Sequence, residues 1–145
     1  MFSRLARDPL FWFACLAAII LWIILNVFGD AVFSFESPKK DSTTFLLMVV
    51  LIYPLLEELA FRGWLQGQLL RLNRLSVTLW LVSSANVLTS IVFAGVHIVA
   101  QHAMLAGLVF FPSLVFGLFR ERYDSVLPSI LLHAFYNFGW FLWVV

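Results

Sequence analysis

Two adjacent glutamates and an arginine interrupt a long apolar stretch near the middle of the sequence. Glu57, Glu58 and Arg62 lie within the run from about Phe45 to Leu70. A charged side chain at the centre of a bilayer costs about 2.5 to 3.5 kcal/mol on insertion scales, so acidic residues there are rare and usually mark a reactive site or an ion pathway. This stretch is therefore the first place in the chain to look for chemistry.

The spacing of these three residues separates the roles of the two acids. On a helix, Glu58 and Arg62 share a face, in the acid-before-base order that favours an i,i+4 ion pair. Successive residues are about 100° apart around a helix, so Glu57 projects in a different direction. We expect Glu58 to be neutralised by Arg62, while Glu57 projects into the interior and takes a partner from among the histidines.

Two histidines and an asparagine stand in later apolar stretches. His97 follows Phe93 by four residues and Asn137 follows His133 by four, so each pair lies on one face of a helix. Taken alone, each of these residues is typical of a polar side chain that hydrogen-bonds between helices. Together with Glu57 they could converge only in the interior of a helix bundle, as a reactive site requires.

These residue types limit the chemistry that the site could perform. The sequence has no Gly-x-Ser-x-Gly elbow, no aspartate pair and no nearby cysteine, so it does not support a covalent nucleophile. A buried carboxylate beside a neutral imidazole can deprotonate a water, and Asn and His donors can stabilise an oxyanion. The alternative is a zinc ion held by Glu57, His97 and His133, although no His-Glu-x-x-His spacing favours it.

The composition indicates that these residues belong to a polytopic membrane protein. Hydrophobic residues make up 63% of the 145 residues and charged residues 12%, against about 45–50% and about 25% in soluble domains. The net charge of +1, without a basic patch among exposed aromatics, gives no indication of a nucleic-acid partner. Cys15 is the only cysteine, which excludes a disulfide framework and predicts a buried, inert thiol.

We expect a single domain over residues 1–145, an all-α bundle of about five transmembrane helices. Residues 9–28 form its first anchor, which is too long for a signal peptide and is followed by no cleavage site. The motif-bearing core is residues 45–145. The other spans are expected at about 45–70, in a stretch ending near 99, at about 103–119, and in a last helix that runs to the C-terminus.

Several local signals refine this scheme. Pro54 removes one backbone hydrogen bond and predicts a kink just before Glu57. Residues 76–82 are expected in the membrane interface, because a helix starting at Ser76 would carry His97 too near the outer surface. His102 is expected to be solvated or to cap a helix at the turn formed with Gln101, rather than to be catalytic.

The ends and contacts of the helices are predicted in the same way. Asp41 to Thr44 provide capping candidates for the second span, and Asp124 or Ser125 should cap the last helix, with Pro128 in its first turns. Two tryptophans are expected as interfacial anchors and three glycines as close-packing points. These are Trp12, Trp22, Gly95, Gly107 and Gly117.

The distribution of basic residues predicts the orientation of the bundle. One side carries Arg4, Arg7, Arg71, Arg74, Arg120 and Arg122, and the other carries Lys39 and Lys40. By the positive-inside rule the N-terminus is cytoplasmic and the C-terminus is outside.

Three short motifs, taken in order, resemble those of the CAAX prenyl-endopeptidase and bacteriocin-processing family, also called the Abi or CPBP family. They are Glu-Glu-x-x-x-Arg at Glu57, Glu58 and Arg62, with Gly63 following, then Phe-x-x-x-His at Phe93 and His97, and His-x-x-x-Asn at His133 and Asn137. The resemblance covers residues 51–138. This chain has about five predicted spans where family members commonly have more, a departure that argues against a prenylated CAAX substrate. Small stand-alone members resemble enzymes that process a C-terminal sorting tail or another membrane-anchored peptide, as in myxosortase-like systems.

The resemblance implies a glutamate-type intramembrane endopeptidase that acts on a membrane-anchored peptide or protein, with a CAAX-like or a C-terminal sorting tail. We expect no cofactor because of ligand supply, since a zinc ion held by Glu57, His97 and His133 would leave no other carboxylate in the site to act as base. The resemblance also implies that Glu57 and His97 activate water and that His133 and Asn137 stabilise the oxyanion. Glu58, Arg62 and Phe93 would be supporting residues. The expected location is the bacterial inner membrane, as a multi-pass protein.

Two alternatives remain open. One is a non-enzymatic membrane protein, either an immunity or chaperone-like factor or a small transporter with a proton relay through Glu57 and the histidines. The absence of an internal repeat is evidence against transport. The other is a zinc-dependent form of the same protease.

Overall fold

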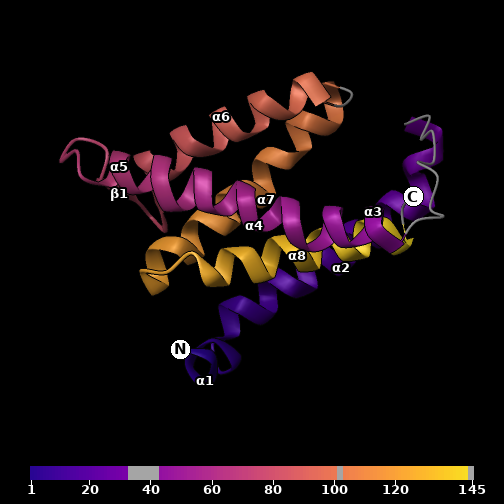
Figure 1. The fold of residues 1–145 in the computed structure, drawn as a ribbon, viewed down its shortest axis with the longest axis horizontal. Helices are drawn as coiled ribbons and strands as arrows, with labels where there is room; N and C mark the ends of the chain where they lie inside the picture. Colours follow the sequence, from indigo (N-terminus) through magenta and orange to yellow (C-terminus); the bar gives the residue numbers. More distant parts are fainter. Residues whose placement is uncertain (33–42, 101–102, 144–145) are drawn as a thin grey trace. The chain divides into compact units, whose positions relative to one another are not determined.

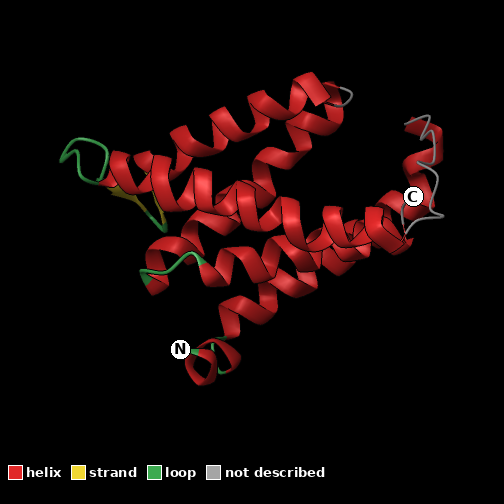
Figure 2. Cartoon of the chain, viewed as in Figure 1, coloured by secondary structure: helices red, strands yellow, loops and turns green. Residues whose placement is uncertain are grey.

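The computed structural model of the chain describes residues 1–32, 43–100 and 103–143, and most of these residues are helical (Figures 1 and 2). The all-α class is therefore confirmed. The chain divides into two compact units, residues 1–55 together with 131–145, and residues 56–130. Each unit is described by itself below, and the single-domain organisation stays a prediction.

The first unit is built around helix α2 (Pro9–Val32), which follows the short helix α1 (Phe2–Ala6). The later part of helix α8 (Leu127–Trp143) packs against it. The Trp22 ring lies 5.0 Å from the Phe135 ring, and the Tyr136 hydroxyl donates a hydrogen bond to the Ala14 carbonyl at 2.9 Å. Gly139 allows this contact, since a Cβ at that position would overlap the Trp22 indole.

A continuous helical stretch runs from Thr43 to Leu70, in agreement with the predicted second span. It consists of α3 (Thr43–Leu47), the π-helical segment η1 (Met48–Ile52), α4 (Tyr53–Glu58), the π-helical segment η2 (Leu59–Gln66) and α5 (Gly67–Leu70). Pro54 has no backbone N–H to donate, and the widened turn of η1 comes immediately before it. The backbone is therefore irregular close to Pro54, whereas the kink expected just before Glu57 stays a prediction.

The second unit contains η2, α5 and a helical pair, α6 (Ser84–Ala100) and α7 (Ala103–Tyr123), packed against each other. A two-stranded antiparallel hairpin, β1 (Thr78–Leu79) and β2 (Val82–Ser83), precedes α6. The prediction that no helix starts at Ser76 is confirmed, because residues 76–83 form a turn and this hairpin.

The predicted end of the fourth span at about residue 119 is too early. Helix α7 continues through Arg120 to Tyr123, because Glu121 turns inward and accepts hydrogen bonds from Gln66 and Ser83. The last helix is capped by Ser125, whose Oγ accepts a hydrogen bond from the Leu127 amide at 3.3 Å. Asp124, the other capping candidate, instead pairs with Arg120 at 2.9 Å.

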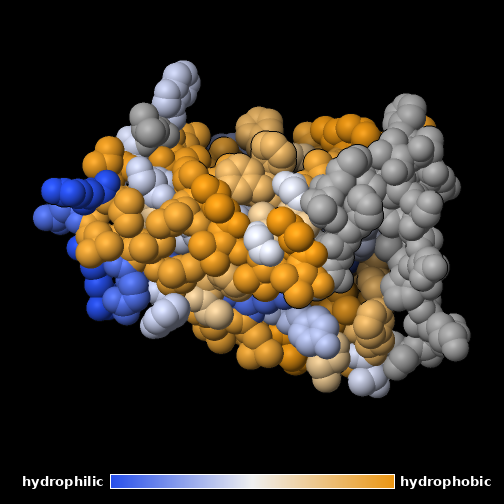
Figure 3. All heavy atoms as spheres, turned by 90° about the horizontal axis from the view of Figure 1, so that it is seen from above, coloured by the Kyte–Doolittle hydropathy of each residue, from blue (hydrophilic) through white to orange (hydrophobic). Residues whose placement is uncertain are grey.

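Two of the described helices are long and apolar enough to cross a membrane, Pro9–Val27 and Thr43–Leu70. Helix α6 contributes a shorter apolar stretch, Ser84–Val99. Large hydrophobic side chains are exposed along these helices, and they cover much of the face seen in Figure 3. Such a surface is typical of helices surrounded by lipid. The count of five spans and the orientation stay predictions.

Some of the smaller expectations are corrected. Trp22 is buried in the first unit and is not an exposed anchor, whereas Trp12 is 58% exposed and donates its indole N–H to the Ala6 carbonyl. Cys15 is half-buried rather than fully buried. Gly95 and Gly107 are not close-packing points, since no described atom outside their own local backbone would lie within 4 Å of a Cβ there.

Several predictions concern residues outside the part of the chain that the structure describes. These are the basic residues Lys39 and Lys40, the capping candidates Asp41 and Ser42, and the turn at Gln101 and His102. They stay predictions.

Gly117 is a close-packing point, as predicted, and it gives a test of the α6–α7 contact. We expect Gly117→Ala to destabilise the protein by about 1 to 3 kcal/mol, because a Cβ would overlap the Asn86 amide. The Asn86 side-chain amide is held in this position, since its Nδ2 atom donates a hydrogen bond to the Leu114 carbonyl at 2.9 Å. Thermal unfolding in detergent measures the change. Gly95→Ala is the matched control and should be neutral or slightly stabilising. An equal loss of stability in both variants would contradict the close contact between Gly117 and Asn86.

Candidate active site

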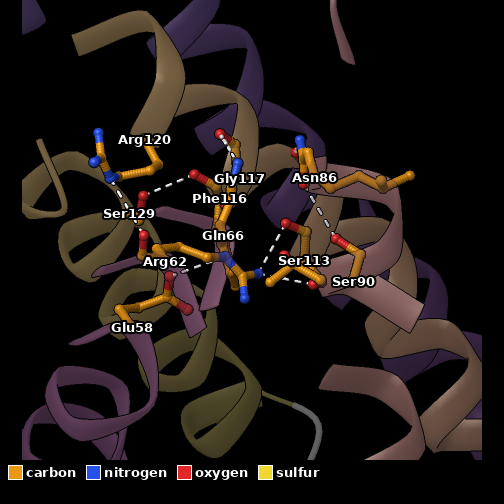
Figure 4. A network of polar contacts seen from close by, with 12 residues as sticks. Glu58, Arg62, Gln66, Asn86, Ser90, Ser113, Phe116, Gly117, Arg120 and Ser129 are labelled. Carbon is orange, nitrogen blue, oxygen red and sulfur yellow. Dashed lines mark hydrogen bonds and ion pairs between the residues drawn. The ribbon is translucent and has the colours of Figure 1, made fainter. Parts of the chain in front are cut away.

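Glu58 and Arg62 form an ion pair in the second unit, where α4 passes into η2 (Figure 4). Arg62 Nε lies 3.3 Å from Glu58 Oε2, and neither side chain is exposed. The predicted i,i+4 pair is therefore confirmed. Breaking a buried pair by removing one partner costs about 3 to 5 kcal/mol, because the remaining charge is left uncompensated.

The Arg62 guanidinium has further partners on α6 and α7. Its Nη2 atom donates to the Ser113 carbonyl at 2.9 Å and to the Ser113 hydroxyl at 2.7 Å. The guanidinium carbon lies 4.8 Å from the centre of the Phe93 ring and 5.9 Å from that of Phe116. Such ring faces attract a cation, which matters here because Nη1 has no hydrogen-bond acceptor among the described residues.

Glu57 lies next to this ion pair but in a different environment. Its side chain is half-buried, whereas Glu58 is fully buried. Arg62 is attracted electrostatically by both carboxylates, more strongly by Glu58 than by Glu57. Of the two acids, Glu57 is thus the one that a water or a substrate can reach. Its expected pairing with a histidine stays a prediction.

His97 is held by Phe93, one helical turn earlier on α6. Its Nδ1 atom lies 2.9 Å from the Phe93 carbonyl oxygen, and the two ring centres are 4.4 Å apart. Because a carbonyl can only accept, Nδ1 must carry the hydrogen, and in the neutral imidazole the lone pair is then on Nε2. The nitrogen of a neutral His97 that can accept a hydrogen bond is therefore Nε2.

Phe93 connects the histidine to the ion pair. It is fully buried, its ring packs edge-on against Phe61 at 4.9 Å, and it contacts both Arg62 and His97. These three contacts join the first and second motifs within one unit. The supporting role of Phe93 in the reaction stays a prediction.

The third motif lies in the first unit, on α8. His133 is buried, and Asn137 is half-buried and donates from Nδ2 to the Val49 carbonyl in η1 at 3.0 Å. An amide nitrogen has two hydrogens, so this bond leaves one available to a substrate. His133 and Asn137 belong to one unit and Glu57 and His97 to the other, so the convergence of all four residues stays a prediction.

A second set of buried polar residues was missed by the sequence analysis. Gln66 donates from Nε2 to the Gly117 carbonyl at 3.1 Å (Figure 4). The same nitrogen donates to Glu121 Oε1 at 2.7 Å. Ser83 Oγ donates to the same Glu121 oxygen at 2.6 Å and accepts from the backbone N–H of Asn86 at 3.0 Å. The signal was present, because Gln66 continues the four-residue spacing of Glu58 and Arg62 along one helical face.

No group of three or more His, Cys, Asp or Glu side chains in the described part of the chain is arranged to hold a metal ion. The candidate ligands Glu57 and His97 belong to one unit and His133 to the other. That catalysis needs no bound metal stays a prediction.

Comparison with known proteins supplies the family. A family model described as type II CAAX prenyl endopeptidase Rce1-like matches residues 39–139, a range that includes all three motifs. No curated protein and no solved structure matches the chain. The matched residues make up more than half of the sequence, and the apolar helices agree with a membrane location. The chain therefore belongs to the type II CAAX prenyl endopeptidase Rce1-like family of integral membrane proteases.

Proposed function

We propose that this chain is a glutamate-type intramembrane endopeptidase that cleaves a peptide bond near the C-terminus of a membrane-anchored substrate. The observation that carries the proposal is the difference between two neighbouring acids. Glu58 is fully buried and paired with Arg62 at 3.3 Å, whereas Glu57 is half-buried and can meet a water. One carboxylate thus stabilises the helix and the other serves the reaction.

In the proposed reaction, Glu57 and His97 together activate the attacking water. The Phe93 carbonyl fixes the hydrogen of His97 on Nδ1, so Nε2 can accept a hydrogen bond from that water. Glu57 takes the proton as the water oxygen attacks the scissile carbonyl carbon. The same proton then passes to the leaving amine as the carbon–nitrogen bond breaks.

His133 and Asn137 have the complementary role in this proposal. Attack on the carbonyl places a negative charge on its oxygen, and preorganised N–H donors stabilise that charge. The Asn137 amide has one hydrogen left after its bond to the Val49 carbonyl. His133, one turn earlier on α8, would provide the second donor.

We infer that the enzyme is a multi-pass protein of the bacterial cell membrane, with its N-terminus in the cytoplasm. The arginine distribution supports this orientation. Two substrates are to be compared with purified protein in nanodiscs: a prenylated peptide ending in a CAAX sequence, and an unprenylated transmembrane peptide with a C-terminal tail. Mass spectrometry of the products locates the cleaved bond, and no cleavage of any membrane-anchored peptide would contradict the proposal.

Metal dependence is tested separately. We expect activity to survive exhaustive chelation, because a metal held by Glu57, His97 and His133 would leave no free carboxylate to act as base. Glu58 cannot take over that role while it is paired with Arg62. Elemental analysis of the active protein accompanies the assay. Activity that is lost with stoichiometric zinc and restored by zinc would show that these three residues are ligands.

A further inference from the structure

The hairpin between α5 and α6 has an unusual residue at its turn. Strands β1 and β2 are joined by the two-residue loop Trp80-Leu81, and Trp80 has a positive φ of 63°. Glycine is the usual residue at the first position of such a loop when φ is positive, because a side chain crowds the backbone there. The turn geometry therefore does not explain the tryptophan, which points to a role for its side chain.

That side chain contacts almost nothing in the second unit. Trp80 is 97% exposed, and the neighbouring Leu81 and Val77 are 58% and 56% exposed. The tip of the hairpin is thus an apolar projection that ends in an indole. Tryptophan combines an apolar body with one N–H donor, which is why it collects at the boundary between hydrocarbon and water.

The base of the hairpin is fixed at the end of the helices. The Ser84 amide donates to the Val77 carbonyl at 3.1 Å, and the Ala85 amide donates to the Leu75 carbonyl at 2.9 Å. Glu121, in the last turn of α7, accepts a hydrogen bond from the Ser83 hydroxyl in β2. The hairpin therefore lies beside the ends of α5 and α7, as Figure 1 shows. The candidate membrane span Thr43–Leu70 also ends there, so a membrane crossed by this helix would have its surface at this level.

The same end of the unit carries an excess of exposed positive charge. Arg71 and Arg74 follow the span directly and are exposed, and Arg122 is exposed in the last turn of α7. The nearby acids are already engaged, since Glu121 bonds Gln66 and Ser83, and Asp124 pairs with Arg120. Exposed arginines beside an apolar, aromatic tip are the combination that binds an anionic lipid surface.

We propose that this hairpin is an interfacial anchor: Trp80 and Leu81 insert among the lipids of the surrounding membrane, and Arg71 and Arg74 bind anionic headgroups beside them. The anchor would hold α6, and with it His97, at a defined depth, because α6 begins directly after β2. The proposal rests on the membrane location and not on the proposed reaction.

The test places a fluorophore on the hairpin of the full-length protein in nanodiscs. In a Cys15→Ala background, Leu81→Cys carries an environment-sensitive fluorophore, and Asn73→Cys, exposed on the same connection, is the matched control. We expect spin-labelled lipid to quench the label at position 81 and aqueous iodide to quench the label at position 73. Equal iodide quenching at the two positions would overturn the insertion.

Two further variants separate the apolar from the charged contribution. Trp80→Gly suits the positive φ, so the turn should persist while lipid quenching at position 81 falls. Arg71→Gln with Arg74→Gln should lower quenching by spin-labelled phosphatidylglycerol, by up to about fivefold for each arginine, but not quenching by spin-labelled phosphatidylcholine. Unchanged preference for the anionic lipid would overturn the assignment of the arginines. Unchanged lipid quenching at position 81 in Trp80→Gly would overturn the proposal that the Trp80 indole inserts among the lipids.

Discussion

A Glu57→Gln variant should insert and fold normally but lose substrate cleavage, with kcat/KM lower by about 100-fold to 10,000-fold. Glutamine has nearly the same shape as glutamate but cannot accept the proton of the attacking water. Glu57 is half-buried and is not the main partner of Arg62, so the structural cost of the change is small. Single-turnover cleavage of a membrane peptide in nanodiscs measures the loss, and thermal unfolding in detergent checks the fold.

The controls for this experiment come from the same helix. Leu56→Ala changes an exposed neighbour of Glu57 and should retain activity. Wild-type activity in Glu57→Gln would remove Glu57 from the mechanism. The transporter alternative would be supported instead if the wild-type protein cleaved no peptide and Glu57→Gln altered the proton flux through it.

The sequence predicted best what depends on neighbours along the chain. The Glu58–Arg62 pair follows from a four-residue spacing on one helix, and the structure places the two atoms 3.3 Å apart. The late start of α6 also follows from local evidence, namely the depth that His97 requires. Such features need only the helical period and the thickness of a bilayer.

Contacts between distant segments could not be predicted in this way. Arg62 bonds Ser113, and Gln66 bonds Glu121, across more than fifty residues of sequence. In an apolar stretch, the sequence does not specify which faces of two helices meet. Gly117 packs closely against Asn86 whereas Gly95 does not, although both glycines lie within apolar helices. The difference depends on how α6 and α7 pack, which the residue type does not reveal.

The π segments were missed for a related reason. A widened turn changes the backbone register over a few residues, and the hydrophobic period over such a short stretch does not distinguish it from an α-helix. Pro54 predicted a kink just before Glu57 and did not indicate a π segment over residues 48–52. The second widened segment, η2, contains Arg62 and Gln66, both fully buried. Polar side chains with distant partners therefore coincide with the irregular backbone there.

The stability counterpart of the Glu57 prediction concerns its neighbour. We expect Glu58→Ala to destabilise the protein by about 3 to 5 kcal/mol, because it leaves the fully buried Arg62 guanidinium without its carboxylate. Ser113 and the rings of Phe93 and Phe116 would remain, but none of them carries a negative charge. Glu57→Ala should change the unfolding midpoint far less.

A double variant decides whether the loss comes from the unpaired charge. Glu58→Leu with Arg62→Met removes both charges and replaces them by apolar side chains, and should be more stable than Glu58→Leu alone, because no uncompensated charge remains. Detergent thermal unfolding of the two single variants and the double variant gives the coupling between the positions. If Glu57→Ala and Glu58→Ala lost equal stability, or if the double variant were no better than the single one, the division between a structural and a catalytic glutamate would be wrong. Cleavage is also assayed on the folded fraction of each variant. A Glu58 variant that folds should keep its activity per folded molecule, since Glu57 and the His97 Nε2 atom are still in place.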